Sequence, residues 1–100
     1  MAELGNLLTT CFRKNKKGSF VIFTKAGCQY CVEAKSIIQN LGAIYEEFDV
    51  PKLSEKVRSQ LQSHVLGHGK KMTVPQIFYY DGQMGVKYIG GCDDLKANLK

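Results

Sequence analysis

Two hydrophobic periodicities alternate along the chain. In residues 2–12, apolar side chains recur at the three- and four-residue spacing of an amphipathic helix. Residues 19–24 (SFVIFT) are almost all apolar. A run of β-branched and aromatic residues of this length indicates a strand that is buried on both faces. Helices are therefore expected to cover both sides of the sheet to which this strand belongs.

The middle of the chain continues this alternation. Residues 29–41 carry one apolar stripe that stops before Gly42, which predicts a second helix. Residues 44–50 show the alternation of a strand, and Pro51 is expected to end it. Residues 53–67 repeat an apolar side chain every four positions, which predicts a third helix.

The C-terminal third predicts a hairpin and a short helix. Strands are expected at 76–80 and 86–89, because the Asp-Gly pair at 81–82 is typical of hairpin turns. Asp93 or Asp94 is expected to cap the final helix by accepting its unpaired N–H groups. The order is then α-β-α-β-α-β-β-α, an α/β fold. Its β-α-β unit makes the first two strands parallel, and the hairpin adds an antiparallel pair.

Length and composition indicate one globular domain over residues 1–100. The chain has 44% hydrophobic and 23% charged residues. These values are near the globular average and argue against a disordered or repetitive segment. No apolar stretch approaches the ~18 residues that a membrane span needs. The N-terminus also lacks the basic segment and apolar run of a secretory signal, so we expect a cytoplasmic protein.

The net charge of +5 comes from 14 basic against 9 acidic residues, with basic side chains gathered at 13–17 and 70–71. Such an excess attracts anions. No aromatic side chains interleave the first cluster, so single-stranded nucleic acid is not indicated. We interpret the clusters as solvated surface, and the alternative is attraction of nucleic acid, acidic lipid or a small anionic substrate.

The informative cysteines are Cys28 and Cys31, which form a C-x-x-C pair where a predicted strand meets a predicted helix. A thiol at a helix N-terminus meets unpaired N–H groups and the positive end of the helix dipole, and Lys25 adds a nearby cation. These influences lower a thiol pKa below the ~8.5 of free cysteine. Cys28 is therefore expected to be the exposed nucleophile, and Cys31 a more buried resolving thiol. Cys11, on the apolar stripe of the first helix, is interpreted as core.

A zinc site is the alternative use of these cysteines. His64 and His68 have the H-x3-H spacing found among zinc ligands. The separation of Cys31 from His64 exceeds the ~12–15 residues of a zinc finger, and a predicted strand and helix intervene. We therefore expect no metal, and we interpret the two histidines as solvent-facing residues near a helix end.

Pro75 lies directly before a predicted strand. A proline cannot donate to a strand ladder, so this position suits a strand start. The X-Pro bond could be cis in such a setting, but the residues alone favour an ordinary loop proline.

Taken together, three blocks of the sequence resemble the glutaredoxin family: KAGCQYC at 25–31, TVP at 73–75 and GGCDDL at 90–95. The resemblance runs from about residue 19 to the C-terminus. It implies a thioredoxin-like fold, with a four-stranded mixed sheet flanked by helices and an extra N-terminal helix. It also implies that the Val74–Pro75 bond is cis and faces the cysteine pair.

The resemblance further implies a function. The protein would be a monomeric glutathione-dependent thiol–disulfide oxidoreductase of cell redox homeostasis and electron transport. With glutathione as reductant and cosubstrate, it would reduce protein disulfides and protein–glutathione mixed disulfides. Cys28 resembles the family's nucleophile and Cys31 its resolving thiol. The remaining implied residues bind glutathione: Lys25, Tyr30, Thr73, Val74, Pro75, Cys92 and Asp93.

These residues resemble particular parts of the family's glutathione site. Lys25 resembles the cation near the glycine carboxylate, and Tyr30 lines the groove. Residues 73–74 resemble the backbone edge that pairs with the cysteinyl part of glutathione. Cys92 and Asp93 resemble the loop that holds the γ-glutamyl end, and the sulfur of Cys92 is interpreted as a small buried apolar group.

The chain also departs from the family pattern. Gln29 stands where the motif usually has proline, and the loop before Thr73 is longer than usual. Either Gln60 or Gln62 could supply the family's helix glutamine. Because some members without the motif proline carry clusters, an alternative function remains open. In it, Cys28 and glutathione hold a [2Fe–2S] cluster between two subunits.

Overall fold

The fold is an open sheet with helices on both faces, seen in a computed structural model that describes residues 2–82 and 85–99. The elements are α1 (Ala2–Asn15), β1 (Ser19–Thr24), α2 (Gln29–Asn40), β2 (Tyr45–Asp49), a 3-10 turn (Val50–Lys52), α3 (Glu55–Gly67), β3 (Gln76–Tyr80), β4 (Val86–Gly90) and α4 (Cys92–Asn98). This is the predicted element order. No helix of the described residues is long and apolar enough to span a membrane.

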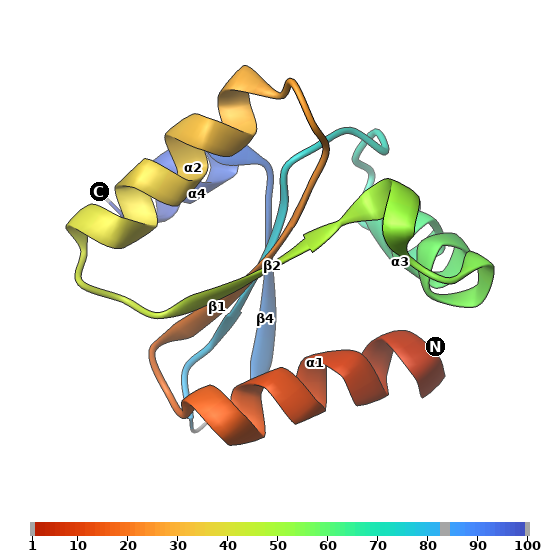
Figure 1. Cartoon of the computed structure of the whole chain (residues 1–100), viewed down its shortest axis with the longest axis horizontal. Helices are drawn as coiled ribbons and strands as arrows, with labels where there is room; N and C mark the ends of the chain where they lie inside the picture. The colour runs from red at the N-terminus through yellow and green to blue at the C-terminus, as the bar shows by residue number, and fades with distance from the viewer. Residues whose placement is uncertain (1, 83–84, 100) are drawn as a thin grey trace.

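The four strands form one mixed sheet in the order β2-β1-β3-β4 (Figure 1). β1 and β2 are parallel, with Phe20 opposite Tyr45, because α2 forms the crossover between them. β3 is antiparallel to β1, with Ser19 opposite Tyr80, and β4 is antiparallel to β3. The predicted mixed sheet is thus confirmed. β1, which the sequence predicted to be buried on both faces, is buried at every position.

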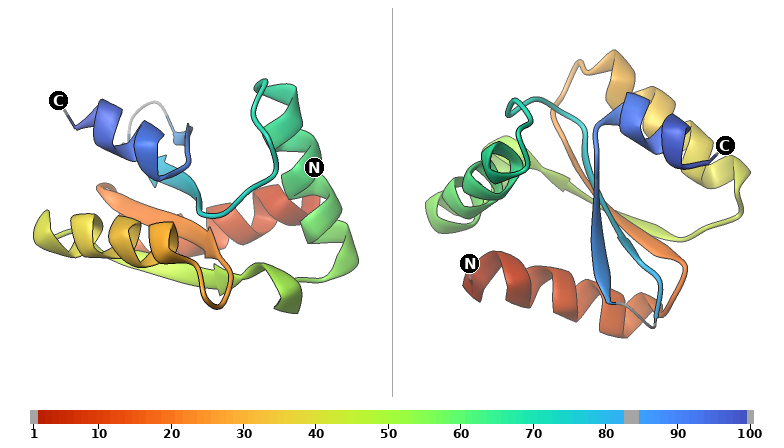
Figure 2. Two further views of the ribbon diagram at one scale, coloured as in Figure 1. Left: turned by 90° about the horizontal axis from the view of Figure 1, so that it is seen from above. Right: turned by 180° about the vertical axis from the view of Figure 1, so that it is seen from behind.

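Helices cover both faces of the sheet (Figure 2), and each face has its own apolar core. α1 and α3 cover one face, where Leu4 and Leu61 pack over Phe23 of β1. α2 and α4 cover the other, where Ile38 and Leu95 meet the strands. The cysteine pair lies at the N-terminus of α2. It is therefore on the face covered by α2 and α4, near the C-terminal end of β1.

Several element boundaries differ from the sequence prediction by one to three residues. α1 continues to Asn15, because Lys16, with a φ of 71°, takes the backbone out of the helix. Ile44 precedes β2 and is exposed, although its alternation placed it in the strand. Its carbonyl still accepts the Phe20 N–H at 2.9 Å. α3 begins at Glu55 rather than residue 53, because the Ser54 hydroxyl caps it.

The cap of α4 is also different from the prediction. Gly91, not Asp93 or Asp94, is the N-cap residue. Asp94 instead lies in the first turn of the helix, and its Oδ2 accepts the Gly91 N–H at 3.0 Å. A carboxylate thus satisfies an unpaired N–H group as expected, but it reaches back from inside the helix.

Candidate active site

Cys28 is the N-cap residue of α2. Its backbone is extended, and its Sγ accepts a hydrogen bond from the Cys31 N–H at 3.0 Å. The turn that leads to it contains Gly27 at φ 77°, a conformation that favours glycine. In the reduced protein, this N–H group and the helix dipole would stabilise a thiolate on Cys28. The predicted placement of the first cysteine at the helix cap is confirmed.

Cys28 and Cys31 form a disulfide across the first turn of α2, with their Cα atoms 5.2 Å apart. Cys31 is only 2% exposed, whereas Cys28 is half-buried. An external thiol or disulfide can therefore reach Cys28 more easily than Cys31. The predicted difference in accessibility between the two cysteines agrees with the structure.

The segment before β3 lies against the first cysteine. Cys28 Sγ is 3.7 Å from the carbonyl oxygen of Val74, and the Val74–Pro75 peptide bond is cis. The resemblance implied this bond, whereas the residues alone favoured an ordinary loop proline. The 73–74 edge and the Cys28 sulfur therefore share one small region of surface.

A cleft of about 410 Å³ extends from this edge toward α4. It brings together most of the residues that the sequence suggested for a substrate: Tyr30, Thr73, Val74, Pro75, Cys92 and Asp93. Asp93 is exposed at the start of α4, and Tyr30 is 60% exposed beside the cysteines. An elongated peptide-like molecule could lie here with its sulfur near Cys28.

Lys25 lies apart from this group. It lines a second cleft, of about 700 Å³, which reaches Cys28 from the β2 side. Glu47 lines the same cleft, where it accepts from the Thr24 hydroxyl at 2.6 Å and pairs with Lys35 at 3.0 Å. The Thr24 hydroxyl, and then Lys35, hold the pKa of Glu47 below its usual value.

The two lysines at 70–71 both line the first cleft. Lys70 forms an ion pair with Asp94, at 2.9 Å between Nζ and Oδ1. This pairing, followed by the Gly91 N–H, lowers the pKa of Asp94. Lys70 therefore braces the 70–73 loop against α4, while Lys71 is exposed in the cleft.

Comparison with known proteins identifies the family. A glutaredoxin family model matches residues 20–84. The chain belongs to the glutaredoxin family. It is 36% identical over 77 residues to glutaredoxin 1 of Rickettsia prowazekii (strain Madrid E), covering 77% of this chain and 73% of that protein.

Solved glutaredoxins share the fold. A buckwheat glutaredoxin–glutathione complex aligns with a TM-score of 0.63 and 28% identity, over 98% of this chain and 83% of that one. The dithiolic glutaredoxin of Trypanosoma brucei brucei aligns with a TM-score of 0.63 and 32% identity, over 90% of this chain and 82% of that one. This glutaredoxin thus has a thioredoxin-like fold, and its C-x-x-C pair is that of a thiol–disulfide oxidoreductase.

Sequence reasoning missed two residues of this glutaredoxin's cleft. Gln76 and Tyr88 both line it, and their side chains are hydrogen-bonded to each other. Gln76 is 2% exposed in a strand that otherwise reads as apolar. A lone amide directly after Pro75 was the available signal, because a buried polar side chain needs partners.

The other two cysteines are free and buried. Cys11 lies in the core under α1, as predicted. Burial, with a further contribution from Glu46, raises its pKa to about 12. Burial also raises the pKa of Cys92, which lies in the core of the other face. Burial therefore disfavours the thiolate form of both of these cysteines.

The histidines do not join the cysteine pair. His64 lies on α3 and His68 directly follows it as the C-cap residue, and their rings pack against Tyr88 at 5.1 and 4.8 Å. The expectation of two solvent-facing histidines is wrong for His64, because its Nε2 is buried and has no hydrogen-bond partner among the described residues. Burial lowers its pKa. Residues 2–82 and 85–99 contain no group of three or more His, Cys, Asp or Glu side chains that could hold a metal ion.

Gln60 also lies away from the cleft. Its Oε1 accepts the Leu4 N–H at 2.9 Å, and its Nε2 donates to Glu3 at 2.7 Å, so it ties α3 to α1.

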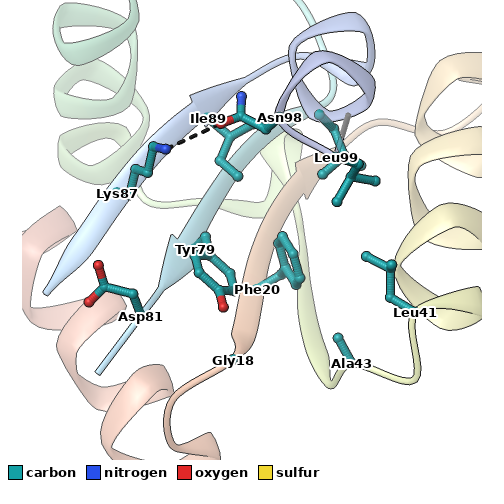
Figure 3. Close-up of a pocket in the computed structure, with 11 residues that line it drawn as sticks. Gly18, Phe20, Leu41, Ala43, Tyr79, Asp81, Lys87, Ile89, Asn98 and Leu99 are labelled. Carbon is teal, nitrogen blue, oxygen red and sulfur yellow. Dashed lines mark hydrogen bonds between the residues drawn. The ribbon is translucent and has the colours of Figure 1, made fainter. Parts of the chain in front are cut away.

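Another pocket, of about 470 Å³, lies between the sheet and the C-terminal ends of α2 and α4 (Figure 3). Leu41 and Leu99 line it, together with residues of the sheet, and it lies apart from the cysteine pair.

Proposed function

We propose that this glutaredoxin is a glutathione-dependent oxidoreductase that reduces protein disulfides and protein–glutathione mixed disulfides. The observation that carries this proposal is the position of Cys28 Sγ, 3.7 Å from the Val74 carbonyl oxygen at the end of the first cleft. The buckwheat relative, whose structure is a complex with glutathione, supports the same ligand.

In this proposal glutathione lies along the first cleft. Its cysteinyl residue pairs with the backbone of Val74, as a peptide adds to an exposed strand edge. Asp93 accepts a charge-assisted hydrogen bond from the γ-glutamyl amine. Lys71 in this cleft and Lys25 in the second cleft, which also reaches Cys28, offer positive charge to the carboxylates of glutathione. Tyr30 and Pro75 shape the groove around the sulfur.

The first reaction needs one enzyme thiol. The Cys28 thiolate attacks the glutathione sulfur of a mixed disulfide, and the target protein leaves as a thiolate that takes up a proton. Cys28 is then joined to glutathione. A second glutathione thiolate attacks this glutathione sulfur, which forms oxidised glutathione and returns Cys28 as a thiolate.

The second reaction needs both enzyme thiols. Cys28 attacks a protein disulfide and is joined to one sulfur of the target, while the other sulfur leaves as a thiolate. Cys31 loses its proton and attacks Cys28, which releases the second target thiolate and forms the Cys28–Cys31 disulfide. Two molecules of glutathione then reduce the enzyme and together become one molecule of oxidised glutathione.

A glutathione-coupled reduction assay on a small mixed disulfide tests the proposal. The parent protein should turn over only when glutathione is present, and Cys28→Ser should be inactive. Cys11→Ser is the matched control, because it removes a buried thiol from the opposite face of the sheet and should keep its activity. Turnover by Cys28→Ser, or none by the parent protein, would overturn the proposal.

The cluster-carrier alternative has a separate test. A [2Fe–2S] cluster takes four thiolates, and the described part of one chain assembles no metal-binding group. A carrier would therefore combine Cys28 thiolates and glutathione across two subunits. A brown, glutathione-dependent dimer in freshly purified protein would favour the carrier. A colourless monomer would favour the oxidoreductase. We propose that the protein acts in the cytoplasm.

A further inference from the structure

The buried side chain of Gln76 is hydrogen-bonded to the backbone of the segment that faces the cysteine pair. Gln76 is the first residue of β3, and its side chain is 2% exposed. Its Nε2 donates to the carbonyl oxygen of Thr73 at 2.7 Å. This bond closes over Val74 and Pro75, the two residues that lie between its partners. The buried amide therefore ties the beginning of β3 to the segment that faces the cysteine pair.

Peptide planarity gives this bond a consequence for ligand binding. The Thr73 carbonyl and the Val74 N–H belong to one planar peptide group, in which they point in opposite directions. A side chain that fixes the Thr73 oxygen also fixes the direction of the Val74 N–H. Val74 is half-buried and lines the first cleft. The direction of its N–H decides whether an extended peptide can pair with this edge.

Tyr88 fixes which end of the Gln76 amide faces Thr73. An amide has one accepting oxygen and one donating nitrogen, and it could turn either toward a neighbour. The Tyr88 hydroxyl donates to Gln76 Oε1, which leaves Nε2 directed to Thr73. Burial raises the pKa of Tyr88, so its hydroxyl stays protonated and able to donate at neutral pH.

The Tyr88 ring is itself held in place. It packs against Phe78 with ring centres 5.1 Å apart, against His64 on α3, and against His68 at the end of that helix. Both Gln76 and Tyr88 also line the first cleft. The chain of contacts therefore runs from the packed α3 face, through two hydrogen bonds, to the Thr73–Val74 peptide.

We propose that Gln76 and Tyr88 are positioning residues for glutathione, which orient the Thr73–Val74 peptide so that the Val74 N–H meets the cysteinyl backbone of the ligand. The inference rests on the proposed function, because it takes glutathione as the occupant of the first cleft. It does not assign either residue a part in the exchange of sulfur.

The test measures binding without reaction. In a Cys28→Ser parent, S-methylglutathione would be titrated by NMR, which reports both the Kd and the Val74 amide resonance. Gln76→Glu keeps the shape of the side chain, but its carboxylate cannot donate to Thr73. Tyr88→Phe removes only the hydroxyl. Tyr79→Phe is the matched control, because its ring lies on the opposite face of the sheet against Phe20.

Losing one hydrogen bond of this kind should raise the Kd about three- to tenfold in Gln76→Glu and Tyr88→Phe. The Val74 amide resonance of the free protein should move in both variants, and Tyr79→Phe should match its parent. With Cys28 restored, the alkylation rate of Cys28 should change less than about twofold, since the N-cap contacts remain. A general loss of structure would instead alter the alkylation rate and the circular dichroism spectrum.

The outcomes separate this inference from the proposed function. If the parent binds S-methylglutathione and Tyr88→Phe binds it equally with an unmoved Val74 resonance, the positioning role is overturned and the function stands. If the parent itself does not bind, both are overturned. If Gln76→Glu does not fold, Tyr88→Phe decides alone, because its ring can keep the packing against α3.

Discussion

Asp93 and Asp94 are neighbours at the start of α4, yet replacement by alanine should affect two different properties. Asp94 accepts from the Gly91 N–H at 3.0 Å and from Lys70 Nζ at 2.9 Å. Asp93 is exposed in the first cleft. We predict that Asp94→Ala lowers stability with little effect on turnover, and that Asp93→Ala lowers glutathione use with little effect on stability.

The magnitudes follow from these contacts. Losing the bond to the Gly91 N–H costs about 1 kcal/mol, as for other helix caps. The exposed Lys70 pair adds roughly 0.5 kcal/mol at most. In a domain of this size, about 1 kcal/mol corresponds to a fall in Tm of about 4–8 °C. A charge-assisted bond from Asp93 to glutathione is worth about 1.5–3 kcal/mol, so kcat/KM should fall about 10–100-fold.

Thermal unfolding and steady-state kinetics would be measured on both variants beside the parent. Asp93→Ala should unfold within about 0.5 kcal/mol of the parent, as exposed substitutions usually do. Asp94→Ala should retain kcat/KM within about threefold. The reasoning would be refuted by unchanged glutathione kinetics in Asp93→Ala, or by an unchanged Tm in Asp94→Ala.

Three further predictions concern titrating groups. The rate of Cys28 alkylation by iodoacetamide in the reduced protein should rise with pH with a midpoint well below ~8.5, because the Cys31 N–H and the helix N-terminus favour the thiolate. A midpoint like that of free cysteine would contradict an activated Cys28. Cys11, with a pKa raised to about 12, should resist alkylation at pH 8 while the protein is folded, and rapid labelling there would contradict its core assignment. Burial lowers the pKa of His64 in the folded protein. As the pH falls below about 6.5, His64 of the unfolded chain therefore takes up a proton before His64 of the folded protein does, which favours unfolding. Tm should therefore fall between pH 7 and 5.5, by less in His64→Phe than in the parent, and equal slopes would exclude His64 as the cause.

Local sequence signals predicted the elements and the placement of Cys28. An almost fully apolar strand, followed by C-x-x-C at the start of a helical apolar stripe, predicts that the first cysteine is at the N-cap of the helix. The Asp-Gly pair likewise indicated the hairpin, in which the Asp81 carboxylate accepts the Gly85 N–H at 3.1 Å. These features depend on residues that are close in sequence, so propensity and spacing could predict them.

The errors concern positions that tertiary contacts decide. Ile44 looked like a strand residue, but β2 begins one residue later, although the Ile44 carbonyl accepts a hydrogen bond from the Phe20 N–H of β1. His64 looked solvent-facing because helix periodicity does not show that Tyr88 of a distant strand packs over it. Gln76 looked like an ordinary strand residue, because its partners lie on a loop and on β4. Lys25, which the resemblance groups with the glutathione site, lines the second cleft together with Cys28, and its role stays a prediction.

The central claim is that Cys28 is the nucleophile and Cys31 only the resolving thiol, and the Cys31→Ser protein tests it most directly. This variant would be treated with oxidised glutathione and analysed by mass spectrometry, with its deglutathionylation and protein-disulfide reductase activities measured in parallel. The account predicts one glutathione on Cys28, retained deglutathionylation and the loss of most protein-disulfide reduction. A folded but inactive Cys31→Ser protein, or glutathione trapped mainly on Cys92 or Cys11, would contradict it.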